Sequence, residues 1–171
     1  MAGIVFVTGG ARSGKSSFAL KEATRLAGRK VYVATAQACD AEMEDRIRTH
    51  KRERGSDWET HEEPMDLAGA LKAVSQTHDV VVIDCLTLWL SNLTCAGSGI
   101  EEAQDAFIDT LHSLDSDMRL FIVSNEVGMG IVPENAMARR FRDMAGRLNQ
   151  RVAEAASEVF FVAAGLPLKI K

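Results

Sequence analysis

The segment 9–16 contains the residue types that proteins use to hold nucleotide phosphates. Gly9, Gly14, Lys15 and Ser16 fit the pattern Gly, four residues, Gly-Lys-Ser, directly after an apolar run at 4–7. In such a loop the backbone N–H groups turn toward anionic oxygens, the lysine supplies a positive charge, and the serine hydroxyl can bind Mg²⁺. A strand-to-helix turn rich in small residues is the plain structural alternative. The pattern predicts a phosphate-binding loop made of Gly9, Gly10, Ala11, Arg12, Ser13, Gly14, Lys15 and Ser16.

A carboxylate that could share the metal ion follows a second apolar run. Residues 80–83 are Val-Val-Val-Ile and lead directly into Asp84, which is the Walker-B arrangement. A buried strand of this kind carries its carboxylate to the edge of the sheet where the phosphate loop lies. Together with the loop, this predicts that Ser16 and Asp84 bind Mg²⁺, against the alternative of a strand-end carboxylate with no metal. Glu126 follows another strand-like run, at 120–124, and either assists at the carboxyl edge of the sheet or caps a loop.

A cationic segment at 41–54 places a histidine among positive charges. Asp40 is a possible N-cap, and Arg46, His50 and Arg54 recur every four residues, so that they share one helical face. The cations Lys51 and Arg52 next to His50 favour a neutral imidazole and attract a triphosphate. Such a histidine could attack phosphorus in a two-step nucleotidyl transfer. The alternative is a solvated charged helix whose histidine has no chemical role.

Strand-like and helix-like segments alternate along the chain and supply the framework for these groups. Strands are predicted at 4–8, 30–34, 80–84, 120–124 and 158–162, and helices at 15–27, 41–54, 66–76, 101–114 and 134–156. Residues 58–62 fit an edge strand or a loop, and 95–100 a flexible connection. This alternation predicts an α/β fold with a mostly parallel sheet.

Length and composition indicate one ordinary globular domain covering 1–171. Apolar residues make up 46% and charged residues 26%, and the net charge of −4 argues against a nucleic-acid groove. The three cysteines fit neither a disulfide framework nor a zinc site. No signal peptide or membrane span is visible, so a cytoplasmic location is expected.

Several other residues are expected to have structural roles. His61, His78 and His112 are interpreted as surface or capping residues. The segment 128–133, which is rich in glycine and ends in proline, is either a mobile lid or a tight turn into the next helix. Methionines at apolar positions are expected to fill the core, namely Met43, Met65, Met118, Met137 and Met144.

Taken together, several segments resemble the bifunctional adenosylcobinamide kinase and adenosylcobinamide-phosphate guanylyltransferase family of cobalamin biosynthesis. The resemblance extends over nearly the whole chain and is weakest at 94–117. It is carried by residues 8–16, 32–36, 46–50, 125–133, 141–150 and 169–171. The segments 125–133 (Asn-Glu-Val-Gly-Met-Gly-Ile-Val-Pro) and 141–150 are far more specific than the phosphate loop, which many families share.

The resemblance implies a P-loop NTPase with a RecA-like sheet flanked by helices, assembled as a homotrimer with GTP bound partly across subunits. It also implies two reactions. ATP or GTP phosphorylates adenosylcobinamide, and GMP is then transferred from GTP to adenosylcobinamide phosphate through a guanylylated histidine. His50 occupies the position of that histidine. Thr49 stands where relatives commonly have a further histidine, and Asp84 where they often have glutamate.

Further site residues follow from the same resemblance. Lys15 and His50 would be catalytic, with Lys15 supporting the departing phosphates. Outside the phosphate loop, the predicted GTP contacts are Ala34, Thr35, Ala36, Lys51, Arg52, Glu53, Arg54, Glu62 and Asp84. Trp89 either packs in the core or lines a pocket for the corrinoid.

Two other function classes are considered beside this one. A P-loop small-molecule kinase or NTPase without a covalent intermediate would leave His50 as a phosphate-binding or surface residue. A non-catalytic, RecA-like module that binds nucleic-acid strands or has a regulatory role is disfavoured by the net negative charge. The sequence also lacks a strip of aromatic and basic residues.

Overall fold

The computed structural model describes residues 3–37, 55, 57–97, 99–114 and 117–171. Its centre is a seven-stranded sheet with the strand order β3-β2-β4-β5-β1-β6-β7, in which only β7 runs antiparallel to its neighbour. The strands are β1 (Gly3–Gly9), β2 (Lys30–Ala34), β3 (Trp58–Glu62), β4 (Val80–Asp84), β5 (Arg119–Asn125), β6 (Glu158–Ala163) and β7 (Leu166–Lys169). The predicted α/β fold is therefore confirmed, and 58–62 is an edge strand.

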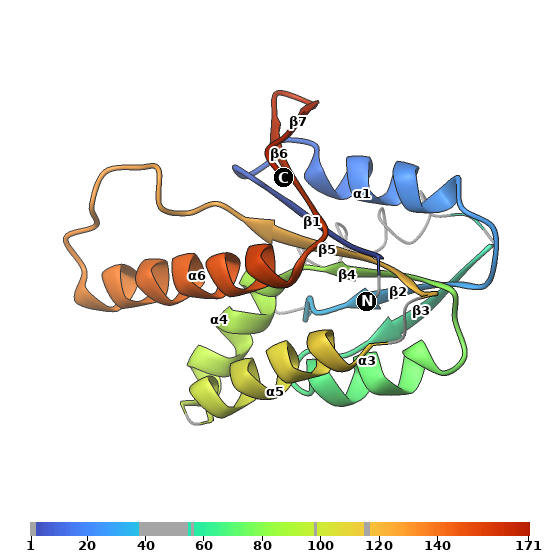
Figure 1. The fold of residues 1–171 in the computed structure, drawn as a ribbon. Helices are drawn as coiled ribbons and strands as arrows, with labels where there is room; N and C mark the ends of the chain where they lie inside the picture. Colours follow the sequence, from blue (N-terminus) through green and yellow to red (C-terminus); the bar gives the residue numbers. More distant parts are fainter. Residues whose placement is uncertain (1–2, 38–54, 56, 98, 115–116) are drawn as a thin grey trace.

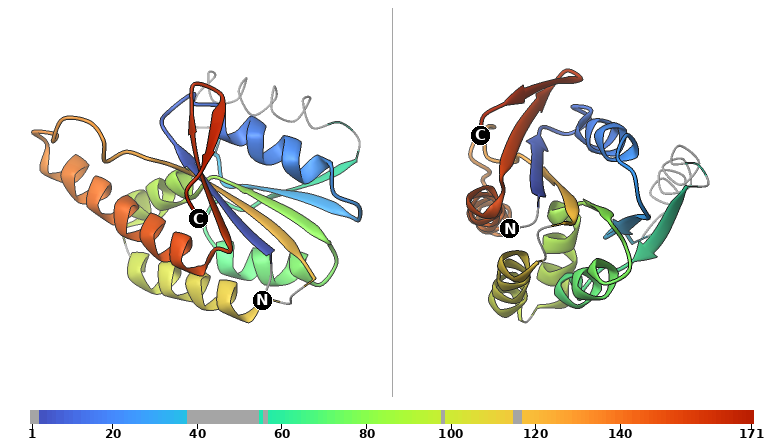
Figure 2. Two further views of the ribbon diagram at one scale, coloured as in Figure 1. Left: turned by 45° about the horizontal axis from the view of Figure 1, so that its top comes forward. Right: turned by 45° about the vertical axis from the view of Figure 1, so that its right-hand side comes forward.

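Helices cover both faces of the sheet in unequal numbers (Figure 1). They are α1 (Lys15–Thr24), α3 (Leu67–Ser75), α4 (Leu86–Ala96), α5 (Ile100–Ser113) and α6 (Ala136–Ala155). Among the described helices only α1 lies on one face, whereas α3, α4, α5 and α6 lie on the other, as the turned views also show (Figure 2). Side chains alternate between these faces along each central strand, so each strand buries both sides and reads as a continuous apolar run.

The two sides of the sheet form separate apolar cores. On the four-helix side, Trp89 and Phe107 pack with their ring centroids 5.3 Å apart. On the α1 side, Ala19 and Ala23 pack against Val123 and its neighbours. The small alanines let α1 approach the sheet closely, which brings the start of this helix to the ends of the strands.

Several predicted elements differ from the structure. Helix α4 and strand β7 were not predicted, and α4 extends into the segment 95–100 that was interpreted as a flexible connection. It ends at Gly97, whose φ of 80° lies in the left-handed region that glycine adopts easily. The predicted helix 41–54 lies outside the described residues. Of the methionines predicted to fill the core, Met118 is buried, but Met65 is 37% and Met137 70% exposed, so that prediction was wrong for these two.

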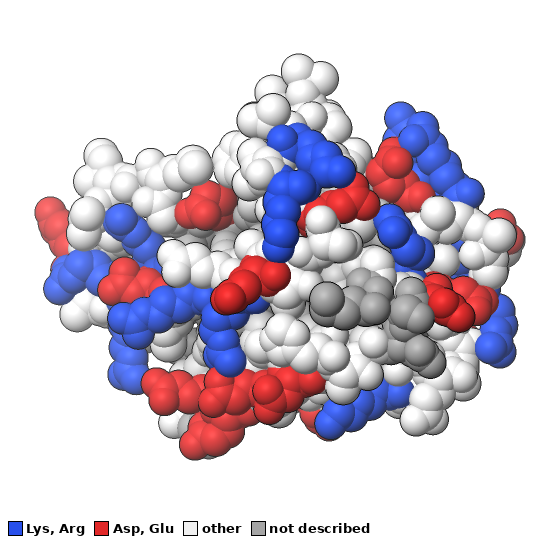
Figure 3. Space-filling view, in the orientation of Figure 1, with Lys and Arg blue, Asp and Glu red and all other residues white. Residues whose placement is uncertain are grey.

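Charged side chains of both signs share the face seen in Figure 3. Acidic residues gather over α5, where Glu101, Glu102 and Asp105 are exposed, and arginines gather over α6. The two groups meet in an ion pair of 2.7 Å between Arg151 and Asp105. No helix in the described part of the chain has the length and apolar character needed to cross a membrane.

Candidate functional site

The phosphate loop connects β1 to α1 at the carboxyl edge of the parallel strands. Gly14 is the N-cap of α1 and has a φ of 94°, which an L side chain rarely adopts. A Cβ at Gly14 would also lie 3.2 Å from the Cα of Gly165. Glycine is thus required at this position by conformation and by space. The first turn of α1 directs backbone N–H groups that have no partner within the helix toward the loop, where anions bind favourably.

Backbone hydrogen bonds from two neighbouring elements brace the loop. The Gly9 carbonyl accepts a bond of 2.9 Å from the N–H of Glu126, just after β5, and the Ser13 carbonyl accepts one of 2.8 Å from the N–H of Gly165 in the β6–β7 turn. The Ser13 hydroxyl is buried and has no hydrogen-bond partner among the described residues. The loop is therefore held from outside, while an unsatisfied polar group is left inside it for a ligand.

Lys15 lies almost completely buried at the start of α1. Its ammonium donates a bond of 2.9 Å to the Gly10 carbonyl, within the loop itself. Burial lowers the pKa of Lys15, and the neighbouring Cys85 and Asp84 raise it. An incoming phosphate would give this ammonium a stronger acceptor than a neutral carbonyl.

Asp84 ends β4 on the same face of the sheet as α1. The hydroxyl of Tyr32, on the adjacent strand β2, donates a bond of 2.7 Å to Asp84 Oδ2. The described residues contain no group of three or more His, Cys, Asp or Glu side chains that could hold a metal. The two oxygen donors Ser16 and Asp84 nevertheless fit Mg²⁺, because this ion usually takes one or two protein oxygens and completes its shell with water and substrate phosphates.

The ends of β2 and β4 are locked together by Thr35. Its buried hydroxyl donates to the Cys85 carbonyl at 2.8 Å and accepts from the Cys85 N–H at 2.7 Å. The side-chain amide of Asn92 donates to the Thr35 carbonyl at 2.9 Å. Burial raises the pKa of the Cys85 thiol to about 12, which keeps this thiol protonated near neutral pH. The predicted contact of Thr35 with GTP stays a prediction.

Some of the remaining predicted site residues lie at the carboxyl edge of the sheet or in the phosphate loop, and the others lie outside the described residues. Ala34 and Glu62 pair in the β2–β3 register, so both lie at the carboxyl edge, where Glu62 is exposed. Ala36 follows β2, and Arg12 is exposed in the phosphate loop. The other predicted residues lie outside the described residues, namely His50, Lys51, Arg52, Glu53 and Arg54.

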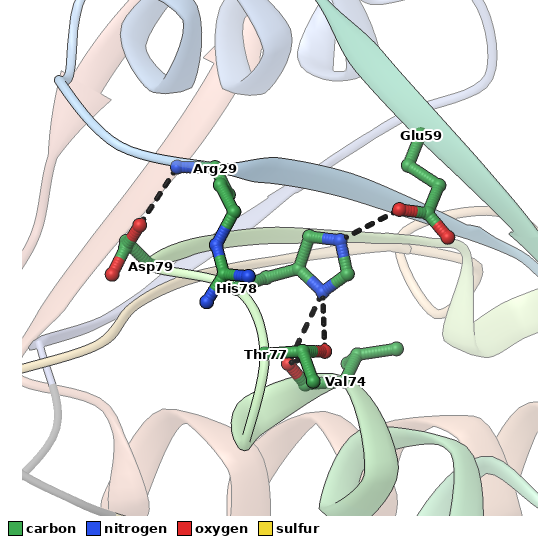
Figure 4. Close-up of polar contacts among 6 residues, drawn as sticks. All are labelled: Arg29, Glu59, Val74, Thr77, His78 and Asp79. Atoms are coloured by element: carbon green, nitrogen blue, oxygen red, sulfur yellow. Dashed lines mark hydrogen bonds and ion pairs between the residues drawn. The ribbon is translucent and has the colours of Figure 1, made fainter.

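His78 lies just before β4, at the end of the sheet opposite to the phosphate loop. It is a structural cap, and Figure 4 shows the contacts of its ring. Its Nδ1 lies 2.9 Å from Thr77 Oγ1 and 3.3 Å from the carbonyl of Val74, near the end of α3, and its Nε2 lies 3.0 Å from Glu59 Oε2. The same region holds the Asp79 carboxylate, which accepts the Arg29 N–H at 2.7 Å. The capping interpretation of His78 is confirmed.

Trp89 packs in the core and does not line a pocket. Its side chain is 1% exposed, and its Nε1 donates to the Met65 carbonyl at 2.8 Å. Sequence reasoning missed Tyr32 as a partner of Asp84, although the segment 32–36 carried part of the family resemblance. It also missed that Thr87 accepts the Asn125 N–H and that Asn149 donates to the Asn125 carbonyl. The alternation along β2 places Tyr32 on the α1 face of the sheet, but no pattern in the sequence pairs it with Asp84.

Comparisons with known proteins agree with this geometry. Residues 5–170 match the family described as cobinamide kinase / cobinamide phosphate guanyltransferase, CobU. The chain is 41% identical over 167 residues to the "Bifunctional adenosylcobalamin biosynthesis protein CobP" of Pseudomonas aeruginosa, covering 96% of this chain and 95% of that protein. It is 39% identical over 184 residues to the "Bifunctional adenosylcobalamin biosynthesis protein CobU" of Salmonella typhimurium, covering 98% and 99%.

Solved structures show the fold alone, because their sequence identity is low. A prototypical ATPase from the type III secretion system of pathogenic bacteria matches with a TM-score of 0.60 and 9% identity over 97% of this chain. The VirB11 ATPase from the Brucella suis type IV secretion system matches with a TM-score of 0.50 and 11% identity over 98% of this chain. This chain spans 56% and 47% of those two proteins. The sheet and its loop are thus of the P-loop ATPase type.

Proposed function

The chain belongs to the cobinamide kinase / cobinamide phosphate guanyltransferase family, and we propose that its single phosphate loop serves both reactions of that family. The protein is an enzyme of cobalamin biosynthesis that phosphorylates cobinamide and then transfers a guanylyl group to the phosphorylated product. The observation that carries the proposal is the arrangement of Lys15 and Asp84. The two are neighbours at the strand ends, and Lys15 begins the helix that follows the loop.

In the kinase step, ATP or GTP lies with its phosphates in the loop. The primary hydroxyl of adenosylcobinamide attacks the γ-phosphorus, the bond from that phosphorus to the β–γ bridging oxygen breaks, and the nucleoside diphosphate leaves with the bridging electrons. Lys15 exchanges the Gly10 carbonyl for the β- and γ-oxygens and neutralises charge on the leaving group. The proton of the attacking hydroxyl passes to solvent or to a phosphate oxygen.

Ser16 and Asp84 are the residues that would hold Mg²⁺, and the ion would neutralise charge on the phosphates. Tyr32 fixes one carboxylate oxygen of Asp84, so the other oxygen is left to face the ion or a water molecule bound to it. Oxygen donors in this number suit magnesium, as described above.

In the guanylyl-transfer step, His50 is proposed as the nucleophile. One ring nitrogen attacks the α-phosphorus of GTP, a P–N bond forms, and pyrophosphate leaves from the loop. A phosphate oxygen of adenosylcobinamide phosphate then attacks the same phosphorus, the P–N bond breaks, and adenosylcobinamide-GDP is released. The cations Lys51, Arg52 and Arg54 would stabilise the charge that develops. The family resemblance around residues 46–50 supports this assignment.

Guanosine recognition is assigned to the ends of β2 and β3. Ala34, Thr35 and Ala36 would present backbone groups, and Glu53 and Glu62 would offer carboxylates to the N–H donors of guanine. The exposed position of Glu62 next to Ala34 in the register supports this assignment.

We further propose a homotrimer in the cytoplasm, with each GTP held partly by a second subunit. The family resemblance supports this assembly. Exposed apolar side chains on the described surface supply contact area for it, namely Met129, Ile131, Val132, Met137, Leu166 and Leu168. Size-exclusion chromatography with light scattering tests it, and a monomeric mass would contradict it.

The covalent step is tested with GTP labelled at the α-phosphorus. The wild-type protein should retain label that is labile in acid and stable in base, and His50→Ala should retain none while keeping much of its kinase rate. Lys15→Ala should slow both reactions by about 100-fold or more. His112→Ala is the matched control, since this exposed histidine on α5 lies outside the site.

Two results would refute the histidine assignment. One is wild-type protein that turns over without ever becoming labelled, and the other is undiminished label on His50→Ala. An equal loss of kinase and transferase activity in His50→Ala would argue that this residue binds phosphate rather than carrying the guanylyl group.

A further inference from the structure

The last residue of β5, Asn125, is held by its backbone from two different helices. The hydroxyl of Thr87, on α4, accepts the Asn125 N–H at 2.7 Å. The side-chain amide of Asn149, on α6, donates to the Asn125 carbonyl at 3.2 Å. Both helices lie on the four-helix side of the sheet. Two side chains from separate helices therefore fix the position of one residue at the strand end.

The side chain of Asn125 belongs to the opposite face. Phe121 and Val123 on the same strand pack into the core beneath α1, and side chains two residues apart in a strand share a face. Asn125 is paired with Gly9 in the β1–β5 ladder, so the same alternation still applies to it. Its carboxamide is thus on the face where α1 and the phosphate loop lie.

Three groups of the nucleotide site surround this position. Gly9, at the entrance to the phosphate loop, is opposite Asn125 in the register. On the other neighbouring strand, β4, Asp84 is opposite Val123. Val123 precedes Asn125 by two residues, so the two side chains share a face of the sheet. Lys15 lies close enough to Asp84 to be affected by its charge. Asn125 therefore stands between the strand that supplies the loop and the strand that supplies the carboxylate.

The carboxamide of Asn125 forms no hydrogen bond with any part of the chain that the structure describes, although its backbone N–H and carbonyl are both bonded. The side chain is only partly exposed. An amide in such a position gains free energy from a ligand that can take its N–H donors.

We propose that Asn125 binds the γ-phosphate, its Nδ2 donating to a terminal oxygen, and that Thr87 and Asn149 are positioning residues for this contact. The inference rests on the nucleotide chemistry proposed above. A donor at the γ-phosphate distinguishes a triphosphate from a diphosphate. It also contacts the group that moves in the kinase step, whereas in guanylyl transfer the γ-phosphate is the remote end of the leaving pyrophosphate.

The test compares affinities for fluorescent GTP and GDP analogues. The wild-type protein gives the reference ratio of the dissociation constants for the GTP and GDP analogues. Whether it binds GTP at all tests the proposed nucleotide chemistry independently of Asn125. Asn125→Ala should weaken GTP by about tenfold and leave GDP nearly unchanged, which is the effect of losing one hydrogen bond to a charged group. Its kinase rate should fall by at least the same factor, with His50 labelling less affected.

Further variants distinguish the contact of Asn125 with the γ-phosphate from the effect of Thr87, which positions Asn125. Asn125→Asp should weaken GTP more than Asn125→Ala, because it places a negative charge beside the γ-phosphate. Thr87→Val should give a smaller effect of the same kind, and Thr87→Ser, which keeps the hydroxyl, should restore the wild-type ratio. Asn135→Ala is the control. It removes a carboxamide that caps α6 and should lower stability without changing the ratio.

The proposal is overturned if Asn125→Ala and Asn125→Asp, both folded by circular dichroism, keep the wild-type GTP-to-GDP ratio. It is equally overturned if GTP and GDP weaken by the same factor, because the contact would then not involve the γ-phosphate. If Asn125→Ala does not fold, the ratio measured for Asn125→Asp and for the Thr87 pair decides in the same way.

Discussion

Tyr32 determines how the carboxylate of Asp84 can be used. Its hydroxyl occupies Oδ2 at 2.7 Å, so the carboxylate is oriented before any metal arrives. Removing this hydrogen bond in Tyr32→Phe should raise the Mg²⁺ concentration needed for half-maximal GTP binding by about tenfold or more, because orientation by an outer partner typically contributes that much to metal affinity. GTP binding in the absence of Mg²⁺ should not change, and titrations with and without Mg²⁺ check both expectations. An equal effect under the two conditions would mean that Tyr32 acts on the nucleotide and not on the metal.

Lys15 is expected to make nucleotide affinity sensitive to alkaline pH. In the protein without nucleotide, burial lowers the pKa of Lys15 below its ordinary value of 10.5. Bound phosphates favour the charged form of the side chain. Affinity for GTP should therefore be complete below the lowered pKa of free Lys15 and should decline as the pH rises through it, beginning below 10.5. A pH series of GTP dissociation constants measures this, with circular dichroism at each pH as the control for folding. Lys15→Ala should remove that part of the pH dependence, and a variant with the wild-type profile would contradict the assignment.

Local patterns in the sequence pointed to the residues that we propose handle phosphate, but not to those that would orient them. Gly14, Lys15 and Ser16 are adjacent in the chain, and Asp84 directly follows its apolar run. Tyr32 is separated by 52 residues from its partner, and this contact leaves no pattern in either segment. Such contacts depend on strand order and register, which the periodicity of one segment does not contain.

At the scale of elements, Thr35 joins β2 to β4. Thr35→Val keeps the shape of the side chain but leaves the buried N–H of Cys85 without its acceptor. The free energy of unfolding should fall by about 2 kcal/mol. Denaturant unfolding measures the loss, and Thr94→Val, which removes only a hydroxyl bonded to the preceding turn of α4, should cost much less. Equal losses in the two variants would show that Thr35 does not brace these strands.

Glu158, at the start of β6, pairs with cations on the strands β5 and β7. Lys169, at 2.8 Å, and Arg119, at 3.4 Å, both pair with this carboxylate. The hydrogen bond from Lys169 contributes most to lowering the pKa of Glu158 below its ordinary 4.5. The resulting stabilisation is present above the ordinary pKa and is lost as the pH falls through the lowered one. Because the partners are largely exposed, Glu158→Gln should cost only about 0.5 kcal/mol at pH 7.

The pH dependence tests whether this loss is electrostatic. The difference in unfolding free energy between the wild-type protein and Glu158→Gln should disappear at a pH well below 4.5, where both side chains are neutral. A difference that persists there would indicate that the substitution disturbs packing instead.

There are physical reasons why α4 and β7 were not predicted from the sequence. Helix α4 starts one residue after Cys85, so its apolar residues read as a continuation of the preceding strand. Strand β7 has only four residues and contains Pro167, which argues against a strand assignment from sequence alone. The central strands were predicted well because they are buried on both sides.

At the scale of the whole molecule, residues from distant parts of the chain meet in one sheet. The parallel strands β4, β5, β1 and β6 form its continuous centre, and the apolar cores lie on its two sides. A single domain over 1–171 is therefore expected to unfold in one cooperative transition. Circular dichroism and tryptophan fluorescence should give the same midpoint, and saturating GTP should shift both together. Separate midpoints would indicate two folding units.

The hydrogen bond from Gly165 to the Ser13 carbonyl has a consequence for biosynthesis. The phosphate loop is translated early, whereas the turn that supports it follows after most of the polypeptide. A growing chain on the ribosome therefore has the glycines and the lysine long before it has their support. The loop is therefore expected to gain this support, and with it its proposed ability to hold GTP, only after the β6–β7 hairpin has been made.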